Sequence, residues 1–131
     1  MDEAGLRREA AAFFDQFVTN FASFNGPRVV SLYAVPGLAI RSDGAVQVLQ
    51  SRPDLEAFFQ RALDGYAALG CCTCRYHDLA VTPIGSRAML SSVTWDLLDA
   101  GGAALKSWRQ SYNLALLPEG WRIAASTEHL D

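Results

Sequence analysis

The sequence predicts an α+β fold in which helices come first and a meander of strands comes last. Residues 87–129 read as three adjacent strands, because runs rich in β-branched and aromatic residues are separated by turn signals. Residues 3–24 show instead the three-and-four spacing of an amphipathic helix. A sheet that buries one face needs a covering layer, and the helices are the expected cover.

The N-terminal part is predicted to form one long and one short helix. Over residues 3–24 the apolar side chains, phenylalanines above all, gather on one wide face, and acidic residues occupy the first turn. Asn25-Gly26-Pro27 ends this helix, since Asn or Gly suits a left-handed cap and Pro suits the start of a new helix. The second helix is predicted over residues 28–33.

A hairpin and a third helix are expected next. Asp43-Gly44 between the apolar runs 38–41 and 45–49 is the strongest hairpin signal in the chain. Ser51 can then cap a helix that ends by Gly70. A strand over residues 71–82 leads from this helix into the meander.

The meander is predicted as strands 87–98, 105–117 and 121–129. A two-residue turn at Gly101-Gly102, and Leu116 placed beside Trp121, fix a register that divides the side chains between two faces. The predicted inner face comprises Met89, Val93, Trp95, Leu97, Trp108, Gln110, Tyr112, Leu114, Leu116, Trp121, Ile123, Ala125, Thr127 and His129. The predicted outer face comprises Ala88, Ser92, Thr94, Asp96, Ser107, Arg109, Ser111, Asn113, Arg122, Ser126 and Glu128.

Composition narrows the class of protein. The length of 131 residues predicts one domain over 1–131, and 50% hydrophobic against 19% charged residues predicts a packed core. A net charge of −3 with scattered basic residues disfavours nucleic-acid binding. No apolar run is long enough for a membrane helix, and the polar N-terminus does not resemble a secretory signal, so a cytoplasmic location is expected.

The cysteines predict neither a disulfide framework nor a metal site. Cys71, Cys72 and Cys74 are an odd number in one short segment. Together with His77 they have ligand-like types, but a step of three residues on a strand reverses the face, and a structural zinc site needs a second ligand pair. We therefore expect buried cysteines acting as small hydrophobic residues, with no metal and no cofactor.

The order of the elements resembles the NTF2-like superfamily, which includes SnoaL-like proteins and ketosteroid isomerases. The residues that carry the resemblance are the Phe-rich first helix, Val29–Ala34, Ser51–Phe59 and Gly120–Ile123. The resemblance implies a cystatin-like, cone-shaped fold, in which a curved antiparallel or mixed sheet wraps around the long N-terminal helix and two further helices. It also implies a pocket between helices and sheet, and homodimers that pair through the outer face of the sheet.

The resemblance does not imply one activity, because this fold serves many. The tyrosine, the base and the sheet aspartate of ketosteroid isomerases fall near Phe17, Arg41 and Gln110–Tyr112, and none of them matches. The Asp-Arg-Asp arrangement of limonene-epoxide-hydrolase-like members is also missing. Whether the chain is an enzyme stays open; an isomerase, dehydratase or cyclase that needs no cofactor is the class implied.

Two histidines are weak catalytic candidates. His77 could act as an acid or base because imidazole titrates near neutral pH, and His129 could close the mouth of a pocket. The plainer alternatives are an exposed strand histidine and a frayed C-terminal end. Asp96 and Arg109 are expected to form an ion pair on the surface or in a dimer interface.

Two functional hypotheses follow. The first is binding of a small hydrophobic ligand between the helices and the sheet, with Tyr33 and Tyr66 reaching it from helices. The second is a non-catalytic homodimerisation module with a filled core. The predicted ligand-lining residues are Phe17, Tyr33, Arg41, Tyr66, Trp95, Trp108, Gln110, Tyr112 and Thr127.

Overall fold

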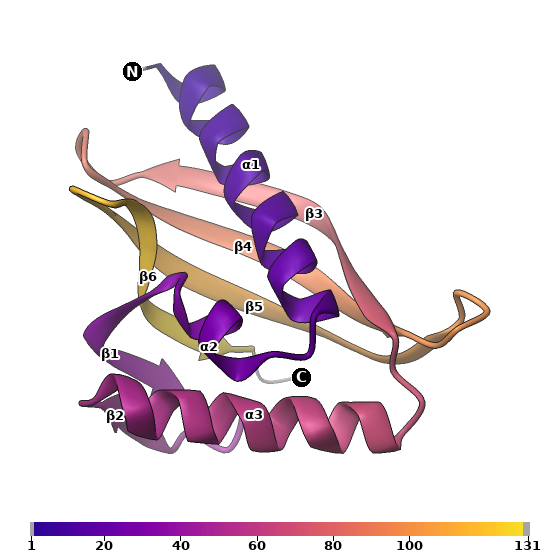
Figure 1. Cartoon of the computed structure of the whole chain (residues 1–131). Helices are drawn as coiled ribbons and strands as arrows, with labels where there is room; N and C mark the ends of the chain where they lie inside the picture. The colour runs from indigo at the N-terminus through magenta and orange to yellow at the C-terminus, as the bar shows by residue number, and fades with distance from the viewer. Residues whose placement is uncertain (1, 130–131) are drawn as a thin grey trace.

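The computed structural model describes residues 2–129 and has the predicted α+β architecture (Figure 1). A long helix lies across one face of a curved sheet, and a second long helix runs along one end of it. The helices are α1 (Glu3–Ala22), α2 (Gly26–Val30) and α3 (Arg52–Ala68). The strands are β1 (Tyr33–Ile40), β2 (Val46–Leu49), β3 (Thr73–Pro83), β4 (Ala88–Leu98), β5 (Ala104–Leu117) and β6 (Gly120–Glu128).

The six strands form one mixed sheet in the order β2-β1-β6-β5-β4-β3. All neighbours are antiparallel except β1 and β6, which are parallel. The last strand thus returns beside the first and joins the hairpin to the meander. This arrangement confirms the predicted curved mixed sheet around a long N-terminal helix and two further helices.

The core forms where the apolar face of α1 meets the meander. The Phe14 ring is fully buried and lies 5.4 Å from the ring of Tyr112 and 6.0 Å from that of Trp95, centroid to centroid. Phe17, one turn further on, lies 5.1 Å from Trp95. The spacing of phenylalanines in the sequence therefore becomes an aromatic contact between helix and sheet.

The caps fix where α2 and α3 begin. The side chain of Asn25 accepts a hydrogen bond from Arg28 N (3.1 Å), and Ser51 Oγ accepts one from Asp54 N (3.2 Å). The short helix was predicted over residues 28–33, but it begins and ends earlier, so Tyr33 opens β1. The prediction that Tyr33 reaches the ligand from a helix is therefore wrong.

The first two strands of the meander have the predicted register. Trp95 lies opposite Trp108, and Ser92 lies opposite Ser111. Leu116 lies opposite Trp121, as expected, so β6 also begins in register.

A bulge then changes the face of every later side chain in β6. Ile123 lies opposite Leu114, but Ala125 lies opposite Asn113, which leaves Ala124 as an extra residue. The predicted inner position of Ala125, Thr127 and His129 is therefore wrong. Ser126 and Glu128, predicted on the outer face, are the side chains that point inward.

Gly37 of β1 makes room for this bulge. A Cβ added at Gly37 would lie 2.8 Å from the carbonyl oxygen of Ala124 and 3.0 Å from that of Ala34. Both contacts are with backbone, which cannot rotate away as a side chain could. The position thus requires the absence of a side chain.

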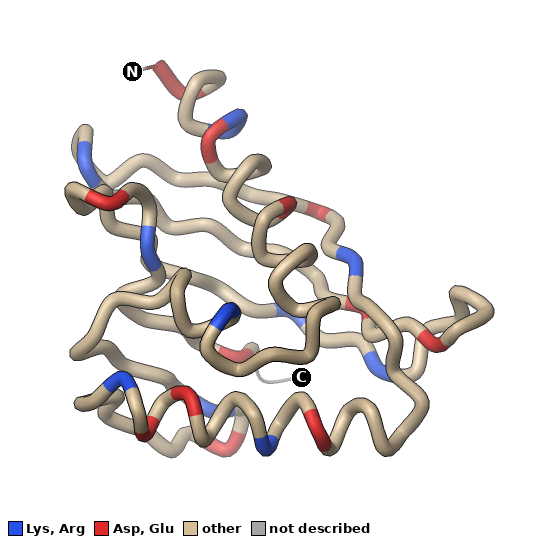
Figure 2. The backbone as a smooth tube through the Cα atoms, in the orientation of Figure 1, with Lys and Arg blue, Asp and Glu red and all other residues tan. Residues whose placement is uncertain are grey.

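Charged residues are spread over the fold. Figure 2 shows acidic and basic residues interspersed along α1 and α3. Among residues 2–129, no helix is long and apolar enough to cross a membrane.

Replacing Gly37 with alanine should destabilise the protein. The new methyl group would press on the Ala124 carbonyl, and we expect a loss of about 1–3 kcal/mol in the free energy of unfolding, measured by urea denaturation. Gly65→Ala is the matched control, because an added Cβ there meets nothing within 4 Å. That change should stabilise α3 by about 0.5–1 kcal/mol. Equal stability of Gly37→Ala and the unmodified protein would contradict the proposed role of the close contact.

Candidate functional site

A cavity of about 200 Å³ lies between the helices and the inner face of the sheet. Nine of the side chains that line it are aromatic, and few are charged. The lining residues are Phe17, Phe21, Val29, Tyr33, Ala39, Ile40, Arg41, Phe58, Phe59, Ala62, Leu63, Tyr66, Cys74, Trp95, Leu97, Lys106, Trp108, Gln110, Tyr112, Ser126 and Glu128. An apolar cavity with a few polar tips is typical of a small-molecule site.

One buried hydrogen bond organises the sheet wall of the cavity. Trp95 Nε1–H donates to the Tyr112 hydroxyl over 2.7 Å, and both side chains are about 2% exposed. Burial raises the pKa of Tyr112 well above its usual value, with the neighbouring Tyr33 adding to the effect. The phenol therefore stays neutral, and its oxygen satisfies the indole.

Two other tyrosine hydroxyls in the lining differ from Tyr112. Within residues 2–129, neither the Tyr33 nor the Tyr66 hydroxyl has a hydrogen-bond partner. Tyr33 is 5% exposed, and its ring packs 4.9 Å from that of Phe59. Burial first, then Tyr66, raises the pKa of Tyr33. Because both tyrosines line the cavity, their hydroxyls can bond to a molecule that enters it.

An ion pair lies at the mouth of the cavity. Arg41 Nε lies 2.9 Å from Glu128 Oε1, and the two side chains are 47% and 29% exposed. The Arg41 guanidinium also lies 5.8 Å from the centroid of the Phe58 ring, within cation–π range. Burial, followed by the charge of Glu128, raises the pKa of Tyr66, while Arg41 opposes the shift.

A second cation stands on the rim. Lys106 Nζ lies 5.3 Å from the Trp108 ring. Trp108 Nε1–H in turn donates to Gln110 Oε1 over 2.8 Å. Along this strand, Lys106, the half-buried Trp108 and Gln110 thus place a charge, an aromatic ring and an amide side by side.

Of the nine residues predicted to bind a ligand, eight lie in the lining of the cavity, all but Thr127, and their binding of a ligand stays a prediction. The bulge at Ala124 moves Thr127 to the outer face, opposite Ser111. Sequence reasoning missed Ser126, Glu128 and Lys106. The position of Lys106 could have been predicted, because Lys106, Trp108 and Gln110 are alternate residues of one strand and so share a face. Ser126 and Glu128 had none, since the bulge is not visible in the sequence.

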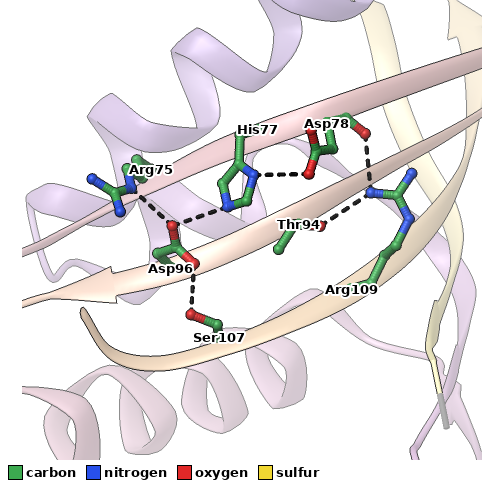
Figure 3. Close-up of polar contacts among 7 residues, drawn as sticks. All are labelled: Arg75, His77, Asp78, Thr94, Asp96, Ser107 and Arg109. Carbon is green, nitrogen blue, oxygen red and sulfur yellow. Dashed lines mark hydrogen bonds and ion pairs between the residues drawn. The ribbon is translucent and has the colours of Figure 1, made fainter. Parts of the chain in front are cut away.

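His77 does not reach the cavity but belongs to a polar network on the outer face (Figure 3). Its Nε2 lies 3.0 Å from Asp96 Oδ2, and its Nδ1 lies 3.1 Å from Asp78 Oδ2. Asp78 has a left-handed backbone (φ 56°) at a bulge in β3, which turns its side chain toward the imidazole.

Asp96 is the centre of this network. It is 5% exposed, and it accepts hydrogen bonds from Arg75 Nε (2.8 Å) and the Ser107 hydroxyl (2.6 Å). Ser107 first, then Arg75, lowers the pKa of Asp96 although burial opposes them. The predicted pair of Asp96 with Arg109 is wrong, because Arg109 donates instead to Asp78 O and Thr94 Oγ1 (Figure 3).

His129 also lies on the outer face. Its Nε2 is 2.6 Å from Ser111 Oγ, which is 2.6 Å from Ser92 Oγ. The predicted closing of the pocket mouth by His129 is therefore wrong. Within residues 2–129, no group of three His, Cys, Asp or Glu residues is placed to hold a metal ion.

The helical cover and the mixed sheet define a cone-shaped α+β architecture of the NTF2 type. A family model described as NTF2-like protein (DUF6841) matches residues 8–131, so the chain belongs to this family. No curated protein matches the chain.

Solved structures with the same fold are distant in sequence. Aln2 from a Streptomyces species is 14% identical, with a TM-score of 0.79 over 100% of this chain and 94% of that one. An NTF2-like protein with a cystatin-like fold from Novosphingobium aromaticivorans is 15% identical, with a TM-score of 0.74 over 95% of this chain and 80% of that one. A ketosteroid isomerase-like protein from Erwinia carotovora atroseptica is 13% identical, with a TM-score of 0.67 over 93% of each chain. These likenesses support the fold.

Removing the Tyr112 hydroxyl should destabilise the sheet wall. Tyr112→Phe leaves the buried Trp95 N–H without an acceptor, so we expect a loss of about 1–3 kcal/mol in the free energy of unfolding, followed by tryptophan fluorescence in urea. Tyr66→Phe is the matched control, because its hydroxyl has no partner in the described part of the chain, and it should change stability little. A Tyr112→Phe protein as stable as Tyr66→Phe would refute the role of this bond.

Proposed function

We propose that this NTF2-like protein binds a small, mostly apolar molecule in the cavity between α1, α3 and the curved sheet. The observation that carries the proposal is the pair of tyrosine hydroxyls, Tyr33 and Tyr66, that line the cavity without a partner in the described residues. Aromatic walls supply the apolar contact, and these hydroxyls would orient a polar atom of the ligand.

The volume limits the size of this molecule. An apolar cavity of about 150 Å³ takes up benzene. A cavity of about 200 Å³ therefore suits a body of one or two rings better than a four-ring steroid. A larger ligand would have to extend through the mouth past Arg41 and Glu128.

The lining groups would also suit proton transfer without a cofactor, as in an isomerase, dehydratase or cyclase. Glu128 is a carboxylate in the lining, and Tyr66 is a neutral phenol close to it. A carboxylate can accept a proton, and a phenol can donate to a developing oxyanion. We propose ligand binding as the function, with this chemistry as its extension.

We also propose that two copies of the chain pair through the outer face of the sheet. That face carries small side chains, among them Ala88, Ser92, Ser111 and Ala115, which allow close approach. Leu90 stands among them with 42% of its surface exposed. Pairing through this face would remove the exposed surface of Leu90 from water.

Filling the cavity should abolish ligand binding. Small aromatic compounds of one or two rings should raise the melting temperature of the unmodified protein, because they bind the folded state. Ala62→Phe places a ring in the cavity and should weaken the binding of the best compound by at least about tenfold. Ala57→Phe, at an exposed position of the same helix, is the matched control. Equal binding by the two variants would argue against this cavity as the site.

Charging the outer face should separate the copies. Leu90→Glu would place two carboxylates in the proposed interface, so we expect a dimer mass for the unmodified protein and a monomer mass for the variant in light scattering. Leu69→Glu, at a leucine that is 71% exposed at the end of α3, should leave the mass unchanged. A monomeric unmodified protein at micromolar concentration would exclude this mode of pairing.

A further inference from the structure

We infer that the ligand is a small organic carboxylate whose anionic group binds the free end of the Arg41 guanidinium at the cavity mouth. This inference rests on the proposed ligand-binding function and specifies its chemical class. The apolar body of the ligand would lie between the aromatic walls, and its carboxylate would point out toward solvent.

Arg41 is held in a way that leaves part of its guanidinium available to a ligand. Its Nε lies 2.9 Å from Glu128 Oε1 in an ion pair, and its guanidinium carbon lies 5.8 Å from the centroid of the Phe58 ring. Within residues 2–129, the terminal Nη1 and Nη2 groups have no partner. These two nitrogens form the planar fork that binds a carboxylate with two parallel hydrogen bonds. Because Glu128 and Phe58 already position the side chain, less rotamer freedom is lost when the ligand arrives.

The lining of the cavity carries a net positive charge. Its charged residues are Arg41, Lys106 and Glu128, which sum to +1. Burial raises the pKa of each lining tyrosine, so the phenols add no negative charge at neutral pH. Because Glu128 is paired with Arg41, Lys106 and the terminal nitrogens of Arg41 remain to attract an anion.

The charges of the lining oppose a cationic ligand and favour an anion over a neutral ligand. A cationic ligand would compete with Arg41 for Glu128 and would be opposed by the net charge of +1 in the lining. A neutral apolar ligand would leave the terminal nitrogens of Arg41 without an acceptor of opposite charge. A carboxylate replaces the water at the fork with charge-assisted hydrogen bonds.

Matched probes of one shape can test the charge requirement. Cinnamate and cinnamamide have the same ring and side-chain length, but at pH 7 only the first is an anion. Titration calorimetry with the full chain should give a dissociation constant about tenfold to a hundredfold lower for cinnamate, as expected for a charge-assisted hydrogen bond. Raising the salt concentration should weaken the binding of cinnamate and leave cinnamamide nearly unchanged.

Two variants should move the preference in opposite directions. Arg41→Gln should bring cinnamate down to the affinity of cinnamamide. Glu128→Gln raises the net charge of the lining by one and keeps an oxygen for Arg41 Nε, so it should strengthen cinnamate binding severalfold. Arg61→Gln is the matched control: Arg61 is exposed on α3 outside the cavity lining, and the change should alter neither probe.

The outcomes separate this inference from the function on which it rests. Equal binding of the two probes, with Ala62→Phe blocking both, would overturn the carboxylate class and leave the ligand-binding site intact. A preference for cinnamate that survives Arg41→Gln would overturn the role of the fork. Failure of both probes to bind, at concentrations where other small aromatic compounds also fail, would overturn the proposed function together with the inference.

Discussion

The candidate site depends on one close backbone contact, the approach of Gly37 to the extra residue Ala124 in β6. Since β1 and β6 are parallel neighbours, the bulge in one strand needs space in the other. Without the extra residue, Ser126 and Glu128 would point away from the helices. Arg41 would then face the cavity without its carboxylate, and the site would present two free cations in place of a positioned guanidinium.

The sequence predicted what depends on local chemistry, and it failed where the cause is tertiary. Periodicity and caps are local, so α1, α3 and the register of β4 with β5 were correct. A bulge adds one residue to a strand without changing the hydrophobic pattern of the sequence. The residues after Ile123 were therefore assigned to the wrong faces of the sheet. The partners of Asp96 were mispredicted for the same reason. The bulge at Asp78, which brings His77 and Arg109 to their partners, cannot be recognised from the sequence pattern.

The two faces of the sheet differ in how their polar groups are satisfied. On the outer face, Asp96 has hydrogen bonds from Arg75 and Ser107 and a contact with His77, so its charge is fully compensated within the chain. On the inner face, the hydroxyls of Tyr33 and Tyr66 and the fork of Arg41 have no partner in the described residues. A chain selected for stability alone would have little reason to keep them, because phenylalanine would fill the same space.

This contrast explains why the inner face, and not the histidine network, is the better candidate for function. A catalytic or binding group must keep bonding capacity for a molecule that is not always present, and the histidine network has used most of its own. The ion pair with Glu128 orients Arg41 and leaves its terminal nitrogens free to donate. The packed aromatic layer of α1 supports these groups from the other side of the core, where Phe14 and Phe17 contact the rigid sheet wall.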